Sequence, residues 1–385
     1  MNFSFTDEQK MIRDTAQAFL AEVSSSDAIR SAMETEQGFD DKIWQRICKE
    51  MYWQAIHIPE DYGGMGLGYV DLVVMLEEMG RYLLCSPFFS TVCLGVNALM
   101  IAGTPKQKQH YLSQICEGSL TATLAFTSNN GQWGANAVEA SVKPQGNDYL
   151  LNGTYRYVPD GHTAQLLIIA ARNEGSEGEE GISLFAIPAD TAGVGRTWLP
   201  TMDQTRKQAE IVLNNVILSN DHLMAEPEAA WPQLNKVIQL ATIATAAEQV
   251  GGSQQILDLT VDYTKERVQF GRTVAGFQAV KHQAADMMLR TEVARSALYY
   301  AACVAEESIS GGPLADELAE AASVSKSYCS DGYFKNASDA IQLHGGVGFT
   351  WEYDVHLYFK RAKSSELFLG NAAYHREQVA KILLD

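Results

Sequence analysis

The 385-residue sequence has few basic residues, no long apolar run and no export signal at its start. Only 29 residues are Lys or Arg, against 47 Asp or Glu, which gives a net charge of −18. This charge argues against nucleic acids and anionic membrane surfaces as partners. No stretch of about 18 apolar residues is present, so no membrane span is predicted. The first residues lack the layout of a signal peptide, and we therefore expect a cytoplasmic protein.

Cysteine and histidine patterns typical of metal sites and disulfides are also missing. The six cysteines never form a Cys-x-x-Cys pair, and the eight histidines never show His-x-x-x-His spacing. We expect buried thiols in a reducing compartment, with no metal and no disulfide. The glycines between positions 63 and 68 lack Gly-x-Gly-x-x-Gly spacing after a strand, so they predict a turn and not a dinucleotide loop.

The character of the sequence changes at two places along the chain. Segment 1–118 shows helical periodicity, and 46% of the whole chain is apolar. Segment 119–225 has short apolar runs spaced as in a small β-barrel or sandwich, and Asn152-Gly153 predicts a hairpin turn there. Segment 226–385 predicts four long helices, near 231–267, 277–308, 314–342 and 352–383, and therefore a bundle. We predict an α+β multidomain fold with an N-terminal helical domain, a middle β domain and a C-terminal four-helix bundle.

One stretch, Tyr263-Thr-Lys-Glu-Arg-Val-Gln-Phe-Gly-Arg272, lies between two of the predicted long helices. It places Arg267 at a helix C-terminal end, with Phe270 and a glycine turn following. A guanidinium group offers a planar fork that suits phosphate. The alternative interpretation is that Arg267 caps the last carbonyls of its own helix.

This stretch, together with Gln342-Leu-His-Gly-Gly-Val-Gly-Phe349, resembles the acyl-CoA dehydrogenase family of flavoenzymes over nearly the whole chain. The resemblance implies the helical–β–helical fold, FAD as cofactor, an acyl-CoA substrate and an electron-transferring flavoprotein as electron acceptor. It also implies an oligomer, because Arg267 and Phe270 of one chain would line the same FAD as Gln342, Gly345 and Gly346 of the next.

The resemblance implies three further contacts to FAD. Thr127 matches a flavin-contacting threonine, Gln278 a glutamine near the adenosine half, and Asn371 a threonine near the pyrophosphate. The alternatives are a strand-end hydroxyl for Thr127 and a surface helix start for Gln278. The family's Trp-Ile-Thr beside the flavin is replaced by Tyr157-Val-Pro159, and a proline nitrogen cannot donate a hydrogen bond.

In the family, a carboxylate removes the α-proton of the acyl-CoA and the β-hydrogen leaves as hydride to the flavin, which yields a 2-enoyl-CoA. Two positions supply that carboxylate in known members, and they are occupied here by Leu369 and Ala241. Glu248 follows Ala241 by two helical turns on the same face, in apolar surroundings. Burial disfavours the charged form of a carboxylate, which suits a general base. The alternative is that Glu248 pairs with a buried arginine.

Glu366 is a second candidate base, which we expect instead to pair with Lys363 or Arg361. Three interpretations of the missing bases stay open. Glu248 is a relocated base of a homo-oligomeric dehydrogenase, or a paralogous subunit supplies the carboxylate to this base-free chain. In the third, the chain catalyses an elimination, such as desulfination of a 3-sulfinoacyl-CoA, or only binds its ligand.

Overall fold

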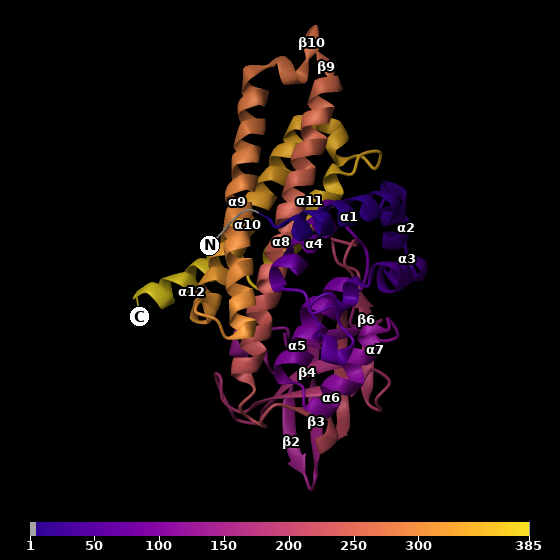
Figure 1. The fold of residues 1–385 in the computed structure, drawn as a ribbon, viewed down its shortest axis with the longest axis vertical. Helices are drawn as coiled ribbons and strands as arrows, with labels where there is room; N and C mark the ends of the chain where they lie inside the picture. The colour runs from indigo at the N-terminus through magenta and orange to yellow at the C-terminus, as the bar shows by residue number, and fades with distance from the viewer. Residues whose placement is uncertain (1–4, 385) are drawn as a thin grey trace. The chain divides into compact units, whose positions relative to one another are not determined.

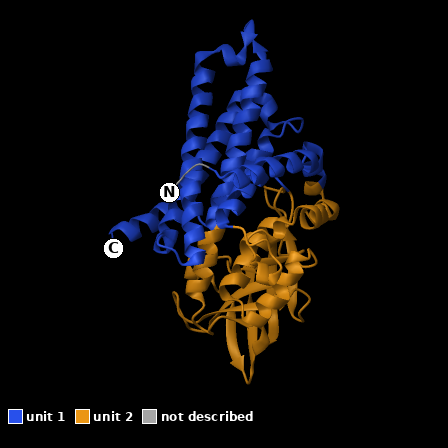
Figure 2. Ribbon diagram, in the orientation of Figure 1, with its two compact units in different colours: residues 1–31, 68–84, 242–385 blue, residues 32–67, 85–241 orange. Residues whose placement is uncertain are grey.

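The computed structural model describes residues 5–384, and the chain divides into two compact units (Figure 2). Unit 1 comprises residues 1–31, 68–84 and 242–385, and unit 2 comprises residues 32–67 and 85–241. Each unit therefore combines segments that are far apart in the sequence. The domain boundaries predicted near residues 118 and 225 stay predictions.

Unit 1 is almost entirely helical (Figure 1). Its N-terminal helices are α1 (Asp7–Val23), α2 (Ser26–Glu34), which runs into unit 2, and α4 (Tyr69–Arg81). Its long helices are α8 (Trp231–Glu266), which begins in unit 2, α9 (Gln278–Ser310) and α10 (Leu318–His344). The shorter helices α11 (Val355–Leu367) and α12 (Ala372–Leu384) complete the bundle. Strands β9 (Val268–Gln269) and β10 (Arg272–Thr273) form a small hairpin between α8 and α9.

Helix α8 is the centre of this bundle. Every residue from 240 to 253 is buried, which explains why all residues of this segment except Glu248 and Gln249 are apolar or small. Helix α4 crosses α8 with its backbone in contact. A Cβ on Gly80 would overlap the carbonyl group of Glu248, and a Cβ on Gly251 would overlap the carbonyl oxygen of Glu77. The two glycines therefore permit this close helix crossing.

The prediction of one helix over 352–383 was wrong, because the chain turns between α11 and α12. Leu369 and Gly370 both have left-handed backbone angles, with φ values of 58° and 100°. Asn371 then accepts a hydrogen bond from the backbone N–H of Tyr374 at 2.9 Å and caps the start of α12. Local helical periodicity on both sides concealed this break.

Unit 2 contains an eight-stranded sheet in the order β6-β7-β3-β2-β4-β5-β8, with β1 paired to β4. The parallel pairs are β1 with β4 and β2 with β4, and the other neighbours are antiparallel. The strands are β1 (Ala122–Ala125), β2 (Ser141–Gln145), β3 (Asp148–Pro159), β4 (Leu166–Asn173), β5 (Ile182–Pro188), β6 (Val194–Leu199), β7 (Gln208–Ser219) and β8 (Leu223–Met224). Apolar residues of β2, β3, β4, β5 and β7 form one buried core, which holds the sheet together.

The hairpin turn predicted at Asn152-Gly153 was wrong. These residues lie inside the long strand β3, and the turn between β2 and β3 is at Gly146-Asn147. The carboxamide of Asn152 accepts from the backbone N–H of Asn215 on β7 at 2.7 Å. A Cβ on Gly153 would lie 2.5 Å from the Cβ of Ala140, so glycine serves close packing here. Pairing with β7 therefore outweighs the local turn preference.

The remaining helices of unit 2 are short. They are α3 (Asp41–Arg46), α5 (Asn97–Ala102), α6 (Pro105–Gln107) and α7 (Ser113–Cys116), with a π-helical segment at Phe89–Val96. Within residues 5–384, no helix has both the length and the apolar character needed to cross a bilayer. The same part of the chain holds no group of three or more His, Cys, Asp or Glu residues arranged to bind a metal ion.

Candidate functional site

The β9–β10 hairpin of unit 1 presents two of the predicted FAD residues to solvent. Phe270 is 93% exposed and has a φ of 52°, an uncommon conformation for an aromatic residue. Arg267 follows the last residue of α8 and is exposed. Its guanidinium group forms no ion pair or hydrogen bond with residues 5–384. The alternative that Arg267 caps its own helix is therefore not what this structure shows, and the guanidinium is free to meet an anion.

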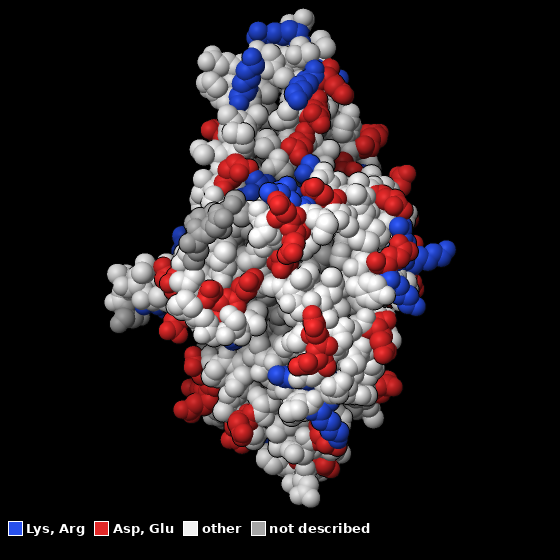
Figure 3. All heavy atoms as spheres, in the orientation of Figure 1, with Lys and Arg blue, Asp and Glu red and all other residues white. Residues whose placement is uncertain are grey.

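This region carries positive charge on a strongly acidic chain. Positions 265–281 contain four basic residues and one acidic residue, and the basic side chains are all exposed. Figure 3 shows Lys and Arg gathered at the end of unit 1 that carries the hairpin. Gln278 is the exposed first residue of α9, so the free N–H groups of a helix N-terminus lie beside these cations. Such a combination suits phosphate groups.

The predicted stretch Gln342–Gly346 forms the C-terminal end of α10. Gln342, Gly345 and Gly346 are all exposed, and a Cβ on either glycine would meet no atom within 4 Å. Gly345 has a φ of 62°, which accounts for glycine at that position, whereas nothing in the chain itself requires glycine at 346. The open space above both glycines fits the approach of a bulky ligand.

The two motifs are neighbours within unit 1. The ring of Tyr263, one turn before Arg267, stacks on the ring of His344 with 4.3 Å between centroids. The Tyr263 hydroxyl also donates to the carbonyl oxygen of His344 at 3.3 Å. An exposed arginine, an exposed aromatic ring and an open glycine pair each suit contact with FAD, and the meeting of the two stretches on one FAD from two chains stays a prediction.

In unit 2, Thr127 lies just beyond β1 and is buried. Its hydroxyl donates to the carbonyl oxygen of Arg156 at 2.8 Å, and the N–H of Arg156 donates to the carbonyl of Thr127 at 3.1 Å. The hydroxyl proton of Thr127 is therefore already used, and its lone pairs remain for a ligand donor.

Strand β3 is irregular at the residue after Arg156. The pairing of β3 with β7 shifts register between Tyr155 and Val158. Tyr157 in this irregularity has a φ of 61° and is 48% exposed. Strained backbone and bulges are concentrated at functional sites. Tyr157 is therefore well placed to act in the aromatic role that the family assigns to tryptophan here, a role that stays a prediction.

At the turn after α11, the side chain at the family's base position is that of Leu369, which is 1% exposed. No carboxylate stands at this turn. Glu366, three residues earlier, pairs with Lys363 at 2.9 Å, as expected. Asn371 is exposed and uses its carboxamide oxygen to cap α12, so its amide NH₂ remains available for the predicted FAD contact.

Glu248 lies in the buried centre of α8, opposite α11. Its Oε2 is 3.8 Å from Nη1 of Arg361, and the two side chains are 9% and 5% exposed. This is the arrangement expected if Glu248 is structural, because a buried carboxylate needs a cationic partner. The role of Glu248 as a base stays a prediction.

Among the buried charged residues that the sequence did not single out, Lys326 and Glu78 have strongly shifted pKa values. Lys326 on α10 is fully buried, and burial lowers its pKa to about 7. Glu78 on α4 is 5% exposed, and burial raises its pKa to about 7. Both interrupt the apolar stripe of an amphipathic helix, and a charge in that position is costly unless it has a partner or a function. A single charged residue within an apolar stripe is therefore the sequence pattern that could have identified these two residues.

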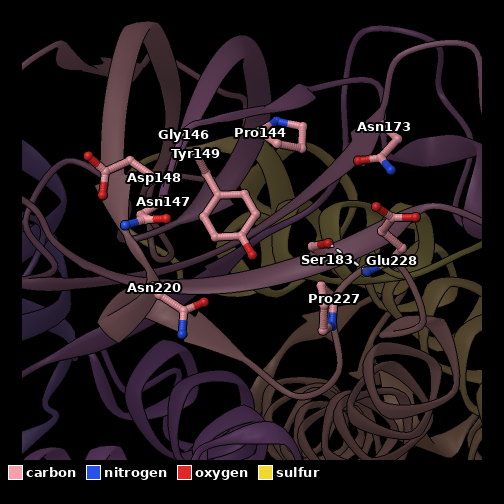
Figure 4. Close-up of a pocket in the computed structure, with 10 residues that line it drawn as sticks. All are labelled: Pro144, Gly146, Asn147, Asp148, Tyr149, Asn173, Ser183, Asn220, Pro227 and Glu228. Atoms are coloured by element: carbon pink, nitrogen blue, oxygen red, sulfur yellow. Dashed lines mark hydrogen bonds between the residues drawn. The ribbon is translucent and has the colours of Figure 1, made fainter.

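A hollow of about 420 Å³ in unit 2 lies apart from the predicted site residues (Figure 4). It is formed by the β2–β3 turn, the end of β4 and the loop after β7, with Tyr149 on one wall. The backbone N–H of Glu228 donates to the hydroxyl of Ser183 at 2.8 Å. The lining of the hollow contains the carboxylates of Asp148 and Glu228 and no Lys or Arg. The hollow therefore does not suit the phosphates of FAD or CoA.

Family models match the chain in three consecutive parts. These are the acyl-CoA dehydrogenase N-terminal domain at residues 6–119, the middle domain at 123–216 and the C-terminal domain at 231–384. The chain is 30% identical to acyl-CoA dehydrogenase IpdE2 of Mycolicibacterium smegmatis, over 98% of both chains.

Two solved structures are also similar over nearly their whole length. One chain, from work on the electron-transferring flavoprotein of Acidaminococcus fermentans, is 28% identical with a TM-score of 0.91 and full coverage of both chains. A chain of the Tcur3481-Tcur3483 steroid acyl-CoA dehydrogenase is 27% identical with a TM-score of 0.86, over 98% of both chains. From these matches and the residues that fit FAD, the chain belongs to the acyl-CoA dehydrogenase family, and it is an FAD-dependent acyl-CoA dehydrogenase.

Proposed function

We propose that this chain is the base-free subunit of a heteromeric acyl-CoA dehydrogenase, in which a second, related chain supplies the catalytic carboxylate. The proposal rests on one observation: the turn where the family places its catalytic base carries the buried aliphatic side chain of Leu369. Ala241 occupies the other usual position and is fully buried. Neither side chain can accept a proton.

The carboxylates nearest in sequence to these positions have structural partners. Glu366 pairs with Lys363, and Glu248 lies beside the buried guanidinium of Arg361. An ion pair holds a carboxylate in place beside its cation, which is the arrangement expected for a structural role. The two stretches predicted to contact FAD, by contrast, keep an exposed arginine, an exposed aromatic residue and exposed glycines. The chain thus keeps the cofactor residues while the residues for proton abstraction are missing.

The similar proteins also favour a two-chain enzyme. The Tcur3481-Tcur3483 steroid acyl-CoA dehydrogenase names two chains, and one of its chains is 27% identical to this protein. We infer from the same name that sterol-derived acyl-CoA thioesters are worth testing beside fatty acyl-CoAs. We also propose an electron-transferring flavoprotein as acceptor, since one similar chain comes from work on such a protein.

In this enzyme, bound FAD would accept the hydride from the β-carbon of the acyl-CoA. The residues of this chain would bind and orient the cofactor. Arg267 and the N-terminus of α9 would hold its phosphates. The partner's carboxylate would take the α-proton, a contribution of about 10²–10⁴ in rate for a general base.

The test is to produce the chain alone and together with paralogous acyl-CoA dehydrogenase chains encoded beside it. Each preparation is mixed without oxygen with a panel of acyl-CoA thioesters, and bleaching of the oxidised flavin is followed. We expect a stable complex of the two chains, with bleaching only by that complex.

Rapid bleaching by the chain alone would contradict the proposal. Glu248→Gln and Glu78→Gln would then show which buried carboxylate acts as the base. A complex whose bleaching survives removal of every candidate carboxylate from the partner would contradict it as well.

A further inference from the structure

The turn between α11 and α12 has an unfavourable backbone that its surroundings must maintain. Leu369 adopts a φ of 58°, a left-handed conformation that is unfavourable for a residue with a side chain. Gly370 follows with a φ of 100°, and a Cβ there would overlap the ring of Tyr374. Such a conformation persists only where neighbouring groups over-determine it.

Lys326 of α10 supplies one set of these groups. Its Nζ donates to the carbonyl oxygens of Ser365 at 2.9 Å, Glu366 at 3.1 Å and Gly370 at 3.0 Å. It also lies 3.0 Å from the hydroxyl of Ser330. The carbonyls at a helix C-terminus have no partner within the helix, and a cation there is favourable. One buried ammonium therefore joins the last turn of α11 to the residue after Leu369.

His375 of α12 holds the same turn from the other side. Its Nε2 donates to the carbonyl oxygen of Leu369 at 2.9 Å, and the Ser323 hydroxyl lies 3.3 Å from Nδ1. Burial, and then the charge of Lys326, lower the pKa of His375 to about 3, so the ring is neutral. A neutral ring with its proton on Nε2 is the tautomer that the Leu369 carbonyl requires.

We propose that Lys326 and His375 are positioning residues that hold the 369–370 turn through its backbone alone, whatever side chain stands at position 369. Every hydrogen bond that Lys326 and His375 make with the turn ends on a peptide carbonyl. The inference rests on the proposed function for its consequence. The backbone of the 369–370 turn would then hold a glutamate at position 369 as it holds leucine. Leu369→Glu should therefore provide a carboxylate that can act as the base.

The buried network around Lys326 extends to α8. The Nε2 of Gln249, the residue after Glu248, donates to the hydroxyls of Ser330 and Ser365 at 3.1 and 3.2 Å. Three helices and the turn are therefore tied to one another by buried polar groups, which rigidify a core when all are satisfied. This explains how α10 can set the position of a residue 43 places further along the chain.

The first experiment measures hydrogen exchange of the turn itself in the FAD-loaded protein. Lys326→Met keeps an unbranched apolar stem but removes the donors, and Lys335→Met on the exposed side of the same helix is the matched control. We expect peptide 366–372 to exchange at least tenfold faster in Lys326→Met, with α9 unchanged and the control equal to the parent. Unchanged protection of the turn in a folded Lys326→Met protein would overturn the proposal.

A second variant decides the question if Lys326→Met does not fold. His375→Phe keeps a ring of similar size and removes the donor to the Leu369 carbonyl. Its turn should also exchange at least tenfold faster. If this variant folds and its turn stays protected, the backbone clamp is refuted.

The second experiment measures flavin reduction by acyl-CoA in the chain alone. Leu369→Glu should be at least 10²-fold faster than Leu369→Gln, which has the same shape without the basic group. Adding His375→Phe to Leu369→Glu should lower kcat at least tenfold and leave KM within twofold. A role limited to overall stability would lower the folded fraction and not the rate per bound flavin.

Hydrogen exchange and flavin reduction together distinguish a failure of the backbone clamp from a failure of the proposed function. If the parent chain alone bleaches rapidly while the turn loosens in the exchange experiment, the proposed function fails and the clamp stands. If Leu369→Glu is active and His375→Phe leaves its kcat unchanged, the clamp fails and the proposed function stands.

Discussion

The buried pair of Glu248 and Arg361 gives a prediction that separates a structural role from a catalytic one. The perturbation is Arg361→Met, which leaves the Glu248 carboxylate in the core without its cation. The two side chains are 9% and 5% exposed, so water can replace little of the lost interaction. Removal of one partner from a buried pair costs about 3–5 kcal/mol. The 3.8 Å separation, longer than a hydrogen bond, places the expected loss near the lower end of that range.

The matched control is Arg376→Met. Arg376 pairs with Asp331 at 2.7 Å, but these side chains are 59% and 56% exposed. An exposed pair contributes about 0–1 kcal/mol, so this variant should resemble the parent. Stability is measured by urea denaturation, followed by tryptophan fluorescence. The double variant Glu248→Gln with Arg361→Met removes both charges and should recover part of the loss.

The same preparations test the chemistry. If Glu248 is structural, Glu248→Gln lowers stability and leaves the rate of flavin reduction per bound FAD close to that of the parent complex. If Glu248 is the base, the rate falls by about 10² or more while the fold is kept. An Arg361→Met protein as stable as the parent would refute the argument from burial.

Three further predictions follow from single residues. Arg267→Ala should weaken FAD binding by roughly 10–150-fold, because a charged hydrogen bond contributes about 1.5–3 kcal/mol, whereas Lys143→Ala, at an exposed lysine of β2, should bind normally. Flavin fluorescence titration measures both, and full FAD occupancy of Arg267→Ala would refute the contact. Burial lowers the pKa of Lys326 to about 7, below its ordinary value in the unfolded chain. Its contribution to stability should therefore rise between pH 7 and about 10 and be lost as pH falls toward 7, and Lys326→Met should lack this dependence in thermal melts. Gly251→Ala should destabilise by about 1–3 kcal/mol, because its Cβ would overlap the α4 backbone, whereas Gly276→Ala, whose nearest contact is 3.5 Å, should melt like the parent.

Local sequence patterns were sufficient for most of the fold. The Thr6-Asp-Glu-Gln9 sequence forms a capping box at the start of α1, since both side chains lie within one turn of the backbone groups that they bond. Arg267 lies at the end of α8, as the glycine turn after it indicated. The loss of both usual bases is also a matter of residue identity, because leucine and alanine cannot accept a proton in any fold.

Patterns failed where a distant segment determined the outcome. Asn152-Gly153 favours a turn locally, yet β7 supplies a pairing partner for the whole of β3, and extended backbone results. The predicted helix over 352–383 is divided at Leu369, where carbonyls of the turn accept hydrogen bonds from Lys326 on the distant helix α10 and from His375 on α12. Sequence periodicity indicates whether a residue is buried, but it does not indicate which distant residues pack against that residue in the fold.

The role of each buried charge was decided only by the tertiary structure. The sequence places Glu248 in an apolar helix, which is equally compatible with a base and with a buried ion pair. Packing of α8 against α11 brings Arg361, 113 residues further along the chain, within 3.8 Å of its carboxylate. The energy of a buried charge depends on the groups within a few ångströms of it, and only the folded chain determines which groups those are.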